Sequence, residues 1–299
     1  MARLATEQVN PASRSFDTKS ALEIARIMNS EDAKVARKVK RVLPTIARAI
    51  DVIADALRKG GRLIYVGTGT SGRMAALDAV ECPPTFNVDA ETVQFILAGG
   101  PAALAKATEA DEDSSALGRR EMLKRRPGPH DVVVGIAASG RTPFTVAALA
   151  AARRRGATTI ALTCNHRSPL ERTADLAIVV VVGPEVISGS TRLKAATAHK
   201  MVLNMLSTGA MTRLGHVYGN LMSSVRRRNS KLRERAVTVV AHGAGLKRPA
   251  AVRALSEADG NASVALVMAR AGVTRADAAR ALTLTGGNVR QAIARARLE

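Results

Sequence analysis

At 299 residues, of which 46% are hydrophobic, the chain is long enough to bury one large core or two smaller ones. Its first ten residues, MARLATEQVN, lack the apolar stretch of a secretory signal. The longest aliphatic run, LAIVVVV at 176–182, has the length of a buried strand and is far too short to span a membrane. The two cysteines lie far apart without CxxC spacing, which suits reduced thiols. We therefore expect a cytoplasmic protein without a membrane partner.

The formal net charge of +20 raises the question of a nucleic acid partner. Basic runs occur at 119–126, 153–155 and 225–235, but they are spread over separate segments, and the chain has no Trp, two Tyr and four Phe for stacking on bases. We interpret the runs as solvated helix faces and expect no nucleic acid binding, although a positive field helps to attract a small phosphorylated anion. The five histidines form no HxxxH or His/Cys cluster, so the sequence predicts no metal site.

Residues 20–61 are predicted to be helical, because apolar residues recur at three- and four-residue spacing up to a Gly-Gly stop. Aliphatic runs and helical stretches then alternate. The runs predict strands at 62–67, 92–100, 131–139, 157–165 and 176–183. Helices are predicted at 71–80, from about 101, at 142–155, after 169 and from about 190. Because the strands are apolar throughout, the sequence predicts an α/β fold: a five-stranded parallel sheet flanked by helices on both faces.

From about residue 247 the pattern is purely helical. It predicts helices at 248–257, 262–271, 274–283 and 288–297, with Thr274 and Asn288 as N-caps. In shape this stretch resembles a small module of the ubiquitin-associated type, and we expect it to serve in packing. We divide the chain into an N-terminal helical arm at 1–46, a sheet domain at 47–235 and a small helical domain at 240–299.

Three predicted strand-to-helix loops combine glycine with hydroxyl side chains: GTGTSG at 67–72, ASGRTP at 138–143 and ISGSTR at 187–192. In a parallel sheet such loops gather at the carboxyl edge, where α/β proteins bind ligands, so they predict one site. Helix N-termini offer free N–H groups and a positive dipole end, which suit a phosphate. The predicted phosphate-binding and substrate-binding residues are Gly69, Thr70, Ser71, Ser139, Gly140, Thr142 and Ser190. Arg141, Glu185, Thr191 and Lys194 are further candidates in the same loops.

The spacing Gly67-x-Gly69-x-x-Gly72 also matches the dinucleotide fingerprint. That fingerprint requires an acidic residue near the end of the second strand, which here ends ILAG at 96–99. We therefore disfavour NAD and FAD as ligands. Since the chain has no GKS or GKT, a nucleotide P-loop is disfavoured too, and a sugar phosphate is the better ligand.

Several long stretches carry a family resemblance. They are TEQVNP at 6–11, MNSED at 28–32, GTGTSGRMAALDAVECPPTF at 67–86, AGGPAALAKATEADED at 98–113, VVGIAASGRTPF at 133–144, GPEVISGSTRLKAATAHKMVLNMLST at 183–208 and GHVYGNLM at 215–222. Through them the chain resembles, almost end to end, the N-acetylmuramic acid 6-phosphate etherase family. These are lyases of cell-wall sugar recycling built on the sugar isomerase (SIS) domain.

The resemblance implies a flavodoxin-like SIS domain and an enzyme that cleaves the D-lactyl ether at C3 of the sugar, giving N-acetylglucosamine 6-phosphate and D-lactate. It implies an amino sugar phosphate as the small-molecule partner, no metal, no organic cofactor, and a homodimer. Two other interpretations stay open. A non-catalytic regulatory protein that binds sugar phosphates need not keep a carboxylate at position 81, and an aldose–ketose isomerase would act on hexose phosphates without the lactyl ether.

The resemblance marks Glu81, in ECPPTF, as the acid/base catalyst and Glu112 as a second catalytic glutamate. An ether resists hydrolysis, but a base can remove the C2 hydrogen of the ring-opened aldehyde, and the C3 oxygen can then leave. Two carboxylates in different surroundings can divide these proton transfers. We expect Pro83-Pro84 to end the helix and to fix the direction of Glu81.

Glu109 is predicted to lie one helical turn before Glu112, on the same face, and to contact the substrate. Asp111 departs from the family, which has a small residue there. A helix from Ser71 to Glu81 would span roughly 15 Å at 1.5 Å per residue, which is farther than a hexose phosphate reaches from its phosphate to C2. Glu81 therefore serves a phosphate held by the 139–142 loop or one held by the other subunit.

Overall fold

The computed structural model describes residues 4–106, 111–223 and 230–298. Contacts within the chain divide it into two compact units. The first comprises Met1–Val80 and Glu91–Ser207, and the second comprises Glu81–Ala90 and Thr208–Glu299. Two long helices, α3 (Gly69–Phe86) and α7 (Lys194–Leu214), contribute residues to both units.

The first unit is built on a parallel sheet of five strands, as the sequence predicts. The strands are β1 (Leu63–Gly67), β2 (Val93–Leu97), β3 (Val132–Ala137), β4 (Thr158–Thr163) and β5 (Leu176–Val179). Their spatial order is β2-β1-β3-β4-β5, and the register aligns Leu63 with Val93 on one side and with Val132 on the other. Every residue of β1 and β3 is buried, which explains why these runs are apolar throughout.

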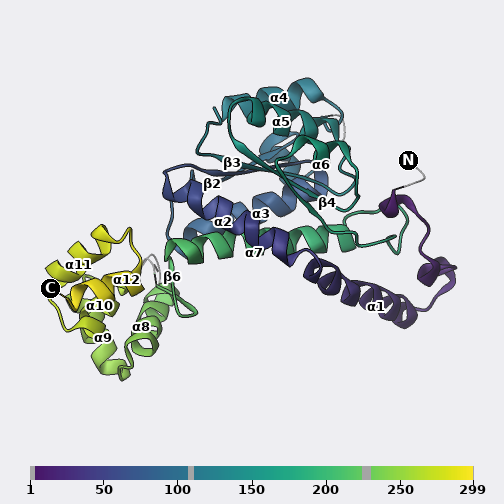
Figure 1. Cartoon of the computed structure of the whole chain (residues 1–299). Helices are drawn as coiled ribbons and strands as arrows, with labels where there is room; N and C mark the ends of the chain where they lie inside the picture. Colours follow the sequence, from purple (N-terminus) through teal and green to yellow (C-terminus); the bar gives the residue numbers. More distant parts are fainter. Residues whose placement is uncertain (1–3, 107–110, 224–229, 299) are drawn as a thin grey trace. The chain divides into compact units, whose positions relative to one another are not determined.

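Helices cover both faces of this sheet (Figure 1). One face packs against α4 (Ser115–Lys124), α5 (Pro143–Arg154) and α6 (Pro169–Thr173), and Ile64, Val133 and Phe144 are part of the buried cluster between them. The other face packs against α2 (Leu43–Arg58), α3 and α7. Side chains alternate along each strand, so the same strands supply both cores.

A buried polar contact joins the sheet to α3 and α7 on this second face. The Tyr65 hydroxyl donates to Asp78 Oδ2 on α3 at 2.8 Å, and Ser207 of α7 donates to Asp78 Oδ1 at 3.1 Å. Burial raises the pKa of Asp78, and the two hydroxyl donors oppose that shift. The contact therefore fixes both helices against the strand that leads into the first glycine–hydroxyl loop.

The N-terminal residues form three 3-10 helices before the long helices begin. These are η1 (Ala5–Glu7), η2 (Pro11–Ser13) and η3 (Phe16–Thr18), followed by α1 (Ala21–Lys40). Ser20 and Glu23 form a capping box at the start of α1. The predicted helical stretch is interrupted at Arg41 and Val42. A new helix, α2, begins at Leu43, and Pro44 lies in its first turn, where the missing N–H of proline is tolerated.

The prediction that Pro83-Pro84 ends the third helix is wrong. Helix α3 continues through both prolines to Phe86. The Asn87 N–H donates to the Pro83 carbonyl oxygen at 3.0 Å, which extends the helical bonding past the prolines. Asn87 then has a φ of +56°, a left-handed conformation that ends the helix one turn later than expected.

Two other boundaries differ from those predicted. The segment after β2 forms a 3-10 helix, η4 (Gly100–Leu104), and the next α-helix starts only at Ser115. Helix α7 starts at Lys194 rather than near residue 190, because the residues before it form a loop closed by a buried carboxylate, which is described below.

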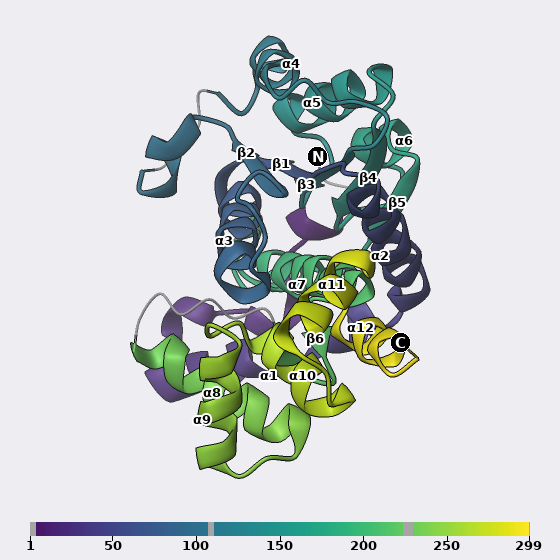
Figure 2. The same cartoon turned by 90° about the vertical axis from the view of Figure 1, so that its left-hand side faces the viewer.

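Besides the ends of α3 and α7, the described part of the second unit contains a two-stranded hairpin, β6 (Val217–Tyr218) and β7 (Leu221–Met222), and five helices. The helices are α8 (Ser230–Ala244), α9 (Arg248–Glu257), α10 (Ala262–Ala271), α11 (Arg275–Leu284) and α12 (Val289–Ala296). Helix α10 packs against the other four (Figure 2). The predicted N-caps are confirmed: Thr274 and Asn288 accept bonds from Asp277 N and Gln291 N. Among the residues described in either unit, no helix has the length and apolar character needed to cross a bilayer.

Candidate functional site

The first glycine–hydroxyl loop joins β1 to α3 and packs too tightly for larger residues. A Cβ atom on Gly72 would lie 2.4 Å from Leu97 Cδ1 and 2.7 Å from the Gly67 carbonyl oxygen. Gly69, the first residue of α3, has a φ of +48°, which favours glycine. The loop therefore holds its backbone close to the end of the strand.

Thr70 and Ser71 lie in the first turn of α3 and are half-buried. The Gly72 N–H donates to the Thr68 carbonyl oxygen at 3.0 Å, which begins the main-chain bonding of the helix. The N–H groups of Thr70 and Ser71 precede that bond, in the position where a helix N-terminus binds an anion.

The second loop, between β3 and α5, has a conformation that requires glycine. Gly140 has a φ of +67°, and a Cβ atom there would lie 2.3 Å from Ser168 Oγ. The Arg141 N–H donates to Ser139 Oγ at 3.1 Å, so this hydroxyl has a fixed place in the turn. Thr142 is the N-cap of α5, and Pro143 fills the first helical position, as expected.

Glu112 lies where these two loops meet. Thr68 Oγ1 donates to Glu112 Oε2 at 3.1 Å, and the Phe144 N–H of α5 donates to the Glu112 carbonyl oxygen at 3.1 Å. The first contact orients the Glu112 carboxylate, and the second fixes the backbone of Glu112 to the start of α5. Sequence reasoning missed Thr68, although it belongs to the same glycine–hydroxyl turn.

The helical spacing expected around Glu112 is not what the structure shows. Residues 111–113 form a turn that precedes Ser114, the N-cap of α4, so Glu112 is not on a helix. Glu109 lies outside the described residues. The prediction of a shared helical face is therefore wrong for Glu112, whose position depends instead on its contacts with Thr68 and Phe144.

The third loop, between β5 and α7, is closed by a side chain of its own. Glu185 is fully buried, and its carboxylate accepts from the Lys194 N–H at 3.0 Å and from the Ala195 N–H at 2.9 Å. Burial raises the pKa of Glu185, and the two backbone donors oppose that shift. Ser190 is half-buried within this loop, and its N–H donates to the Ile187 carbonyl oxygen.

Behind the first loop lies His199 of α7, which sequence reasoning did not select. Its side chain is buried, with Nδ1 3.4 Å from Ser71 Oγ and Nε2 3.7 Å from Cys164 Sγ. Burial lowers the pKa of His199 to about 4, so the imidazole is neutral near pH 7. Burial also raises the pKa of the Cys164 thiol, which keeps it protonated and unreactive. His199 thus supports Ser71 as a neutral partner.

Glu81 lies on α3 with an exposed side chain. It belongs to the second unit, whereas the other predicted site residues that the structure describes belong to the first. The structure therefore brings Glu112, Thr68 and the first two loops together within one unit.

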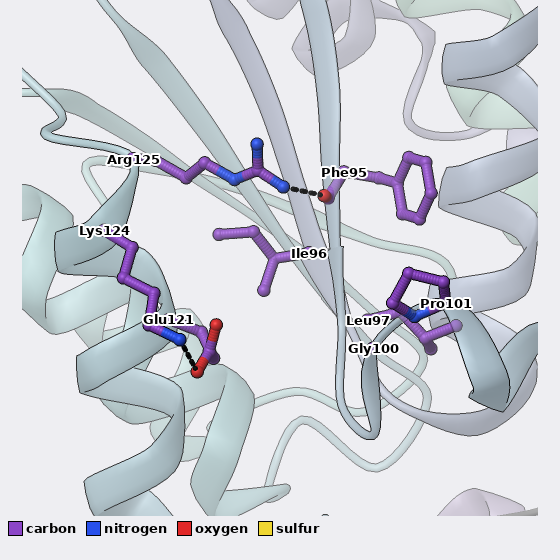
Figure 3. A pocket seen from close by; sticks show the side chains of 8 residues that line it. All are labelled: Phe95, Ile96, Leu97, Gly100, Pro101, Glu121, Lys124 and Arg125. Carbon is purple, nitrogen blue, oxygen red and sulfur yellow. Dashed lines mark hydrogen bonds and ion pairs between the residues drawn. The ribbon is translucent and has the colours of Figure 1, made fainter.

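A cavity of about 370 Å³ opens between β2 and α4. Figure 3 shows its lining residues: Phe95, Ile96, Leu97, Gly100, Pro101, Glu121, Lys124 and Arg125. None of them is a predicted site residue. Lys124 Nζ lies 2.8 Å from Glu121 Oε1, and Arg125 Nη2 donates to the Phe95 carbonyl oxygen at 3.4 Å. Its cations already have partners, which makes it a weaker phosphate site than the loops.

The part of the chain that the structure describes contains no group of three or more His, Cys, Asp or Glu residues placed to hold a metal ion. The hydroxyl groups and backbone N–H groups of the first two loops suit an anion, and Glu112 beside them can take or give a proton. This combination fits acid–base chemistry on a small phosphorylated ligand.

Comparison with known proteins identifies the domain and the fold. Residues 45–153 match the glucokinase regulatory protein N-terminal SIS domain, and residues 116–209 match the SIS domain. The fold resembles a phosphoheptose isomerase from Francisella tularensis with a TM-score of 0.51 at 18% identity, over 65% of this chain and 100% of that one.

Several relatives match most of the chain, as two examples show. The N-acetylmuramic acid 6-phosphate etherase of Symbiobacterium thermophilum is 55% identical over 265 residues, 88% of each chain. That of Aeromonas hydrophila is 49% identical over 266 residues, 89% of each chain. At this identity and coverage, the chain belongs to the N-acetylmuramic acid 6-phosphate etherase family.

Proposed function

We propose that the protein is a carbon–oxygen lyase that cleaves the D-lactyl ether of N-acetylmuramic acid 6-phosphate, giving N-acetylglucosamine 6-phosphate and D-lactate. The observation that carries this proposal is the 49–55% identity to etherases over 88–89% of the chain. The reaction belongs to amino sugar metabolism and would serve the recycling of peptidoglycan. The protein would need no metal and no organic cofactor for it.

The phosphate of the substrate would bind at the first two loops. The proposed contacts are Gly69, Thr70 and Ser71 at the start of α3 and Ser139, Gly140 and Thr142 before α5. Both segments precede helices whose N-terminal dipole ends favour an anion. Ser190 remains a proposed substrate contact, and we assign it to the sugar rather than to the phosphate, because Glu185 already occupies the N-terminus of α7.

The reaction would proceed by elimination and re-addition. In the ring-opened sugar a base removes the C2 proton, a C2–C3 double bond forms, and the C3–O bond breaks. The departing lactate oxygen receives a proton. Water then adds to C3 of the unsaturated aldehyde and C2 is protonated again, so that one water is consumed for each lactate released.

We assign the C2 proton to Glu81 and the proton exchange at the C3 oxygen to Glu112. Because α3 places Glu81 roughly 15 Å from Ser71, Glu81 would serve a phosphate held by the other subunit of the dimer. The family resemblance of ECPPTF and of the 106–113 segment supports these two roles. The hydrogen bond from Thr68 orients the Glu112 carboxylate. A group that exchanges protons with both a leaving oxygen and an incoming water needs such a fixed orientation. Glu109 is proposed as a further substrate contact.

We also propose that the protein is a cytoplasmic homodimer. Both cysteines are buried thiols, which suits a reducing compartment. On α1, Leu22 is 59% exposed, and Ile24 and Ile27 are half-buried, which suits a helix that packs against a second copy. Sedimentation equilibrium would measure the mass of the particle, and a monomer at micromolar concentration would contradict the dimer.

The test of the reaction is to incubate the purified protein with N-acetylmuramic acid 6-phosphate, without added metal, and to assay free D-lactate. We expect lactate release, and in ¹⁸O-water we expect the label at C3 of the sugar product. Label in the lactate instead would contradict the elimination. Tight binding without lactate release would favour the regulatory alternative, and turnover of hexose phosphates alone would favour the isomerase.

A further inference from the structure

Two N-terminal motifs, TEQVNP and MNSED, have no role in the proposed reaction, yet the structure places residues of the first, and Glu31 of the second, against the loops of the site. Residues 4–10, which we call the N-terminal strap, lie beside the loops that follow β4 and β5 (Figure 1). Leu4, Thr6 and Asn10 of the strap are buried, although the segment is irregular apart from one 3-10 turn. The burial of so short a segment indicates that it positions the loops that it contacts.

Thr6 bridges the end of β4 and the third loop. Its side chain is fully buried, and its carbonyl oxygen accepts from the Gly189 N–H at 3.2 Å. Its hydroxyl accepts from Asn165 Nδ2 at 3.3 Å. Ser188 Oγ donates to the Glu7 carbonyl oxygen at 3.1 Å. The strap therefore holds the residues immediately before Ser190.

Asn165 carries this contact on to the second loop. Its Nδ2 also donates to the Ala138 carbonyl oxygen at 2.9 Å, and its Oδ1 accepts from the Ala5 N–H at 2.9 Å. Ala138 directly precedes Ser139 of the phosphate site. Through this buried amide the strap is fixed to the second loop, whereas the main chain of Thr6 and Glu7 fixes it to the third.

Asn10, at the other end of the strap, joins α1 to the start of the third loop. Its Nδ2 donates to Glu31 Oε2 at 3.0 Å and to the Pro184 carbonyl oxygen at 3.1 Å, and its Oδ1 accepts from the Ala12 N–H at 3.0 Å. Glu31 Oε2 also accepts from Lys194 Nζ at 2.6 Å, and both of these side chains are buried. The third loop is thus held at Pro184 and at Lys194 by the N-terminal region.

We propose that the N-terminal strap completes the substrate site, with Thr6, Asn10 and Asn165 as positioning residues that set the third loop against the second. The strap touches no reacting atom in this proposal. It pre-organises the loop that carries Ser190 so that substrate binding does not have to order it. The inference rests on the proposed function, because the site that the strap completes is the one proposed to bind the amino sugar phosphate.

The first test compares two asparagine variants. Asn10→Ala removes the three bonds at the end of the strap, and Asn29→Ala removes an exposed asparagine of α1 as a matched control. We expect Asn10→Ala to raise the KM for N-acetylmuramic acid 6-phosphate about tenfold and to change kcat less than about threefold, the pattern of lost ground-state binding. The control should change neither constant by more than about twofold.

A merely structural role for the strap predicts a different pattern. Asn10→Ala would then lower the unfolding temperature and the amount of active protein while the KM of the folded fraction stayed unchanged, and that result would overturn the proposal. If Asn10→Ala does not fold, Thr6→Val takes its place, since it removes only the hydroxyl and keeps the shape. An unchanged KM in folded Thr6→Val would equally overturn the proposal.

Hydrogen exchange separates the strap from the reaction itself. Because the strap already orders the third loop, exchange at residues 186–193 of the ligand-free protein should be slower in wild type than in Asn10→Ala, even if no lactate is ever released. Absence of lactate in wild type together with this difference would overturn the proposed reaction and support the strap. Lactate release in wild type together with equal exchange at residues 186–193 in both proteins would leave the reaction standing and overturn the strap.

Discussion

The N-termini of α3 and α7 follow similar loops, rich in glycine and hydroxyl residues, but they present different surfaces. At α7 the carboxyl group of the buried Glu185 accepts from the first two N–H groups of the helix, so a side chain of the protein itself occupies this N-terminus. At α3 the main-chain bonding starts at Gly72, after Thr70 and Ser71, and Thr68 uses its hydroxyl to donate to Glu112. The difference shows that a glycine–hydroxyl loop indicates an acceptor group at a helix N-terminus, and that a nearby buried carboxyl group of the protein can be that acceptor.

The largest effect should come from Glu81, which lies at neither N-terminus. If the helix N-termini serve binding and Glu81 serves proton transfer, Glu81→Gln should lower kcat roughly 10²–10⁴-fold with little change in substrate affinity, because an amide cannot take the C2 proton. Lactate release under saturating substrate measures kcat. The exposed Glu257→Gln in α9 is the matched control and should keep full turnover. Full turnover in Glu81→Gln would remove this residue from the mechanism.

The next effect depends on pH and concerns the buried ion pair between Glu31 and Lys194, the first residue of α7. Hydrogen bonds from Lys194, Lys34 and Asn10 lower the pKa of Glu31 from 4.5 to about 2, against the opposing effect of burial. The folded pKa lies below the unfolded one, so the unfolded state takes up the proton first as the pH falls. The stabilisation, roughly 3 kcal/mol, should be present above about pH 4.5 and lost down to about pH 2.

Urea unfolding at pH 7, 5 and 3 measures this loss. The double variant Glu31→Gln with Lys194→Met removes both charges, and its stability should fall less between pH 5 and pH 3 than that of the wild type. The single variant Glu31→Gln would leave Lys194 buried without its carboxylate partner and should be the less stable of the two variants. An equal fall in wild type and double variant would show that other carboxylates carry the acid sensitivity.

A smaller effect is expected when the N-termini of α3 and α7 are compared directly. Thr70→Val and Thr191→Val each remove one hydroxyl and keep the side-chain shape. Thr70→Val should raise the KM about tenfold, as expected for a lost hydrogen bond to a charged ligand, and Thr191→Val should change it less than about twofold. Steady-state lactate release gives both constants. Equal increases would mean that the phosphate is held at α7 as strongly as at α3.

Part of the fold could be predicted from the sequence. The type of each strand and helix, and their order along the chain, were predictable because buried apolar runs and helical spacing are local signals. Helices α9 and α10 begin and end where the sequence predicts. The side chain of Asn261 caps α10, and Pro249 lies in the first turn of α9, where its missing N–H is tolerated. The three loops were recognisable from their composition, and comparison with etherases confirms the family.

The contacts that could not be predicted from the sequence join residues that are distant in the chain. Glu31 and Lys194 are 163 residues apart, so no local pattern reveals their pairing. The position of Glu112 depends on Thr68, and that of Asn10 depends on Pro184, for the same reason. The roles assigned to the predicted site residues stay predictions until the variants are measured.

The smallest effect should come from Glu185→Gln, which alters the buried carboxyl group at the N-terminus of α7 without changing its size. The amide oxygen can accept from only one of the two N–H groups, at Lys194 or Ala195, so we expect a loss of about 1 kcal/mol and an unfolding temperature lower by roughly 2–4 °C. Burial raises the folded pKa of Glu185 above its unfolded value, so its contribution is complete below about pH 4.5 and declines as the pH rises through the folded pKa. The advantage of wild type over Glu185→Gln should therefore be larger at pH 4 than at pH 8, opposite in sign to the effect of Glu31. Calorimetric unfolding at both pH values measures it. An advantage that grows toward pH 8 would mean that the carboxylate is held in its charged form by its two backbone donors more strongly than burial opposes it.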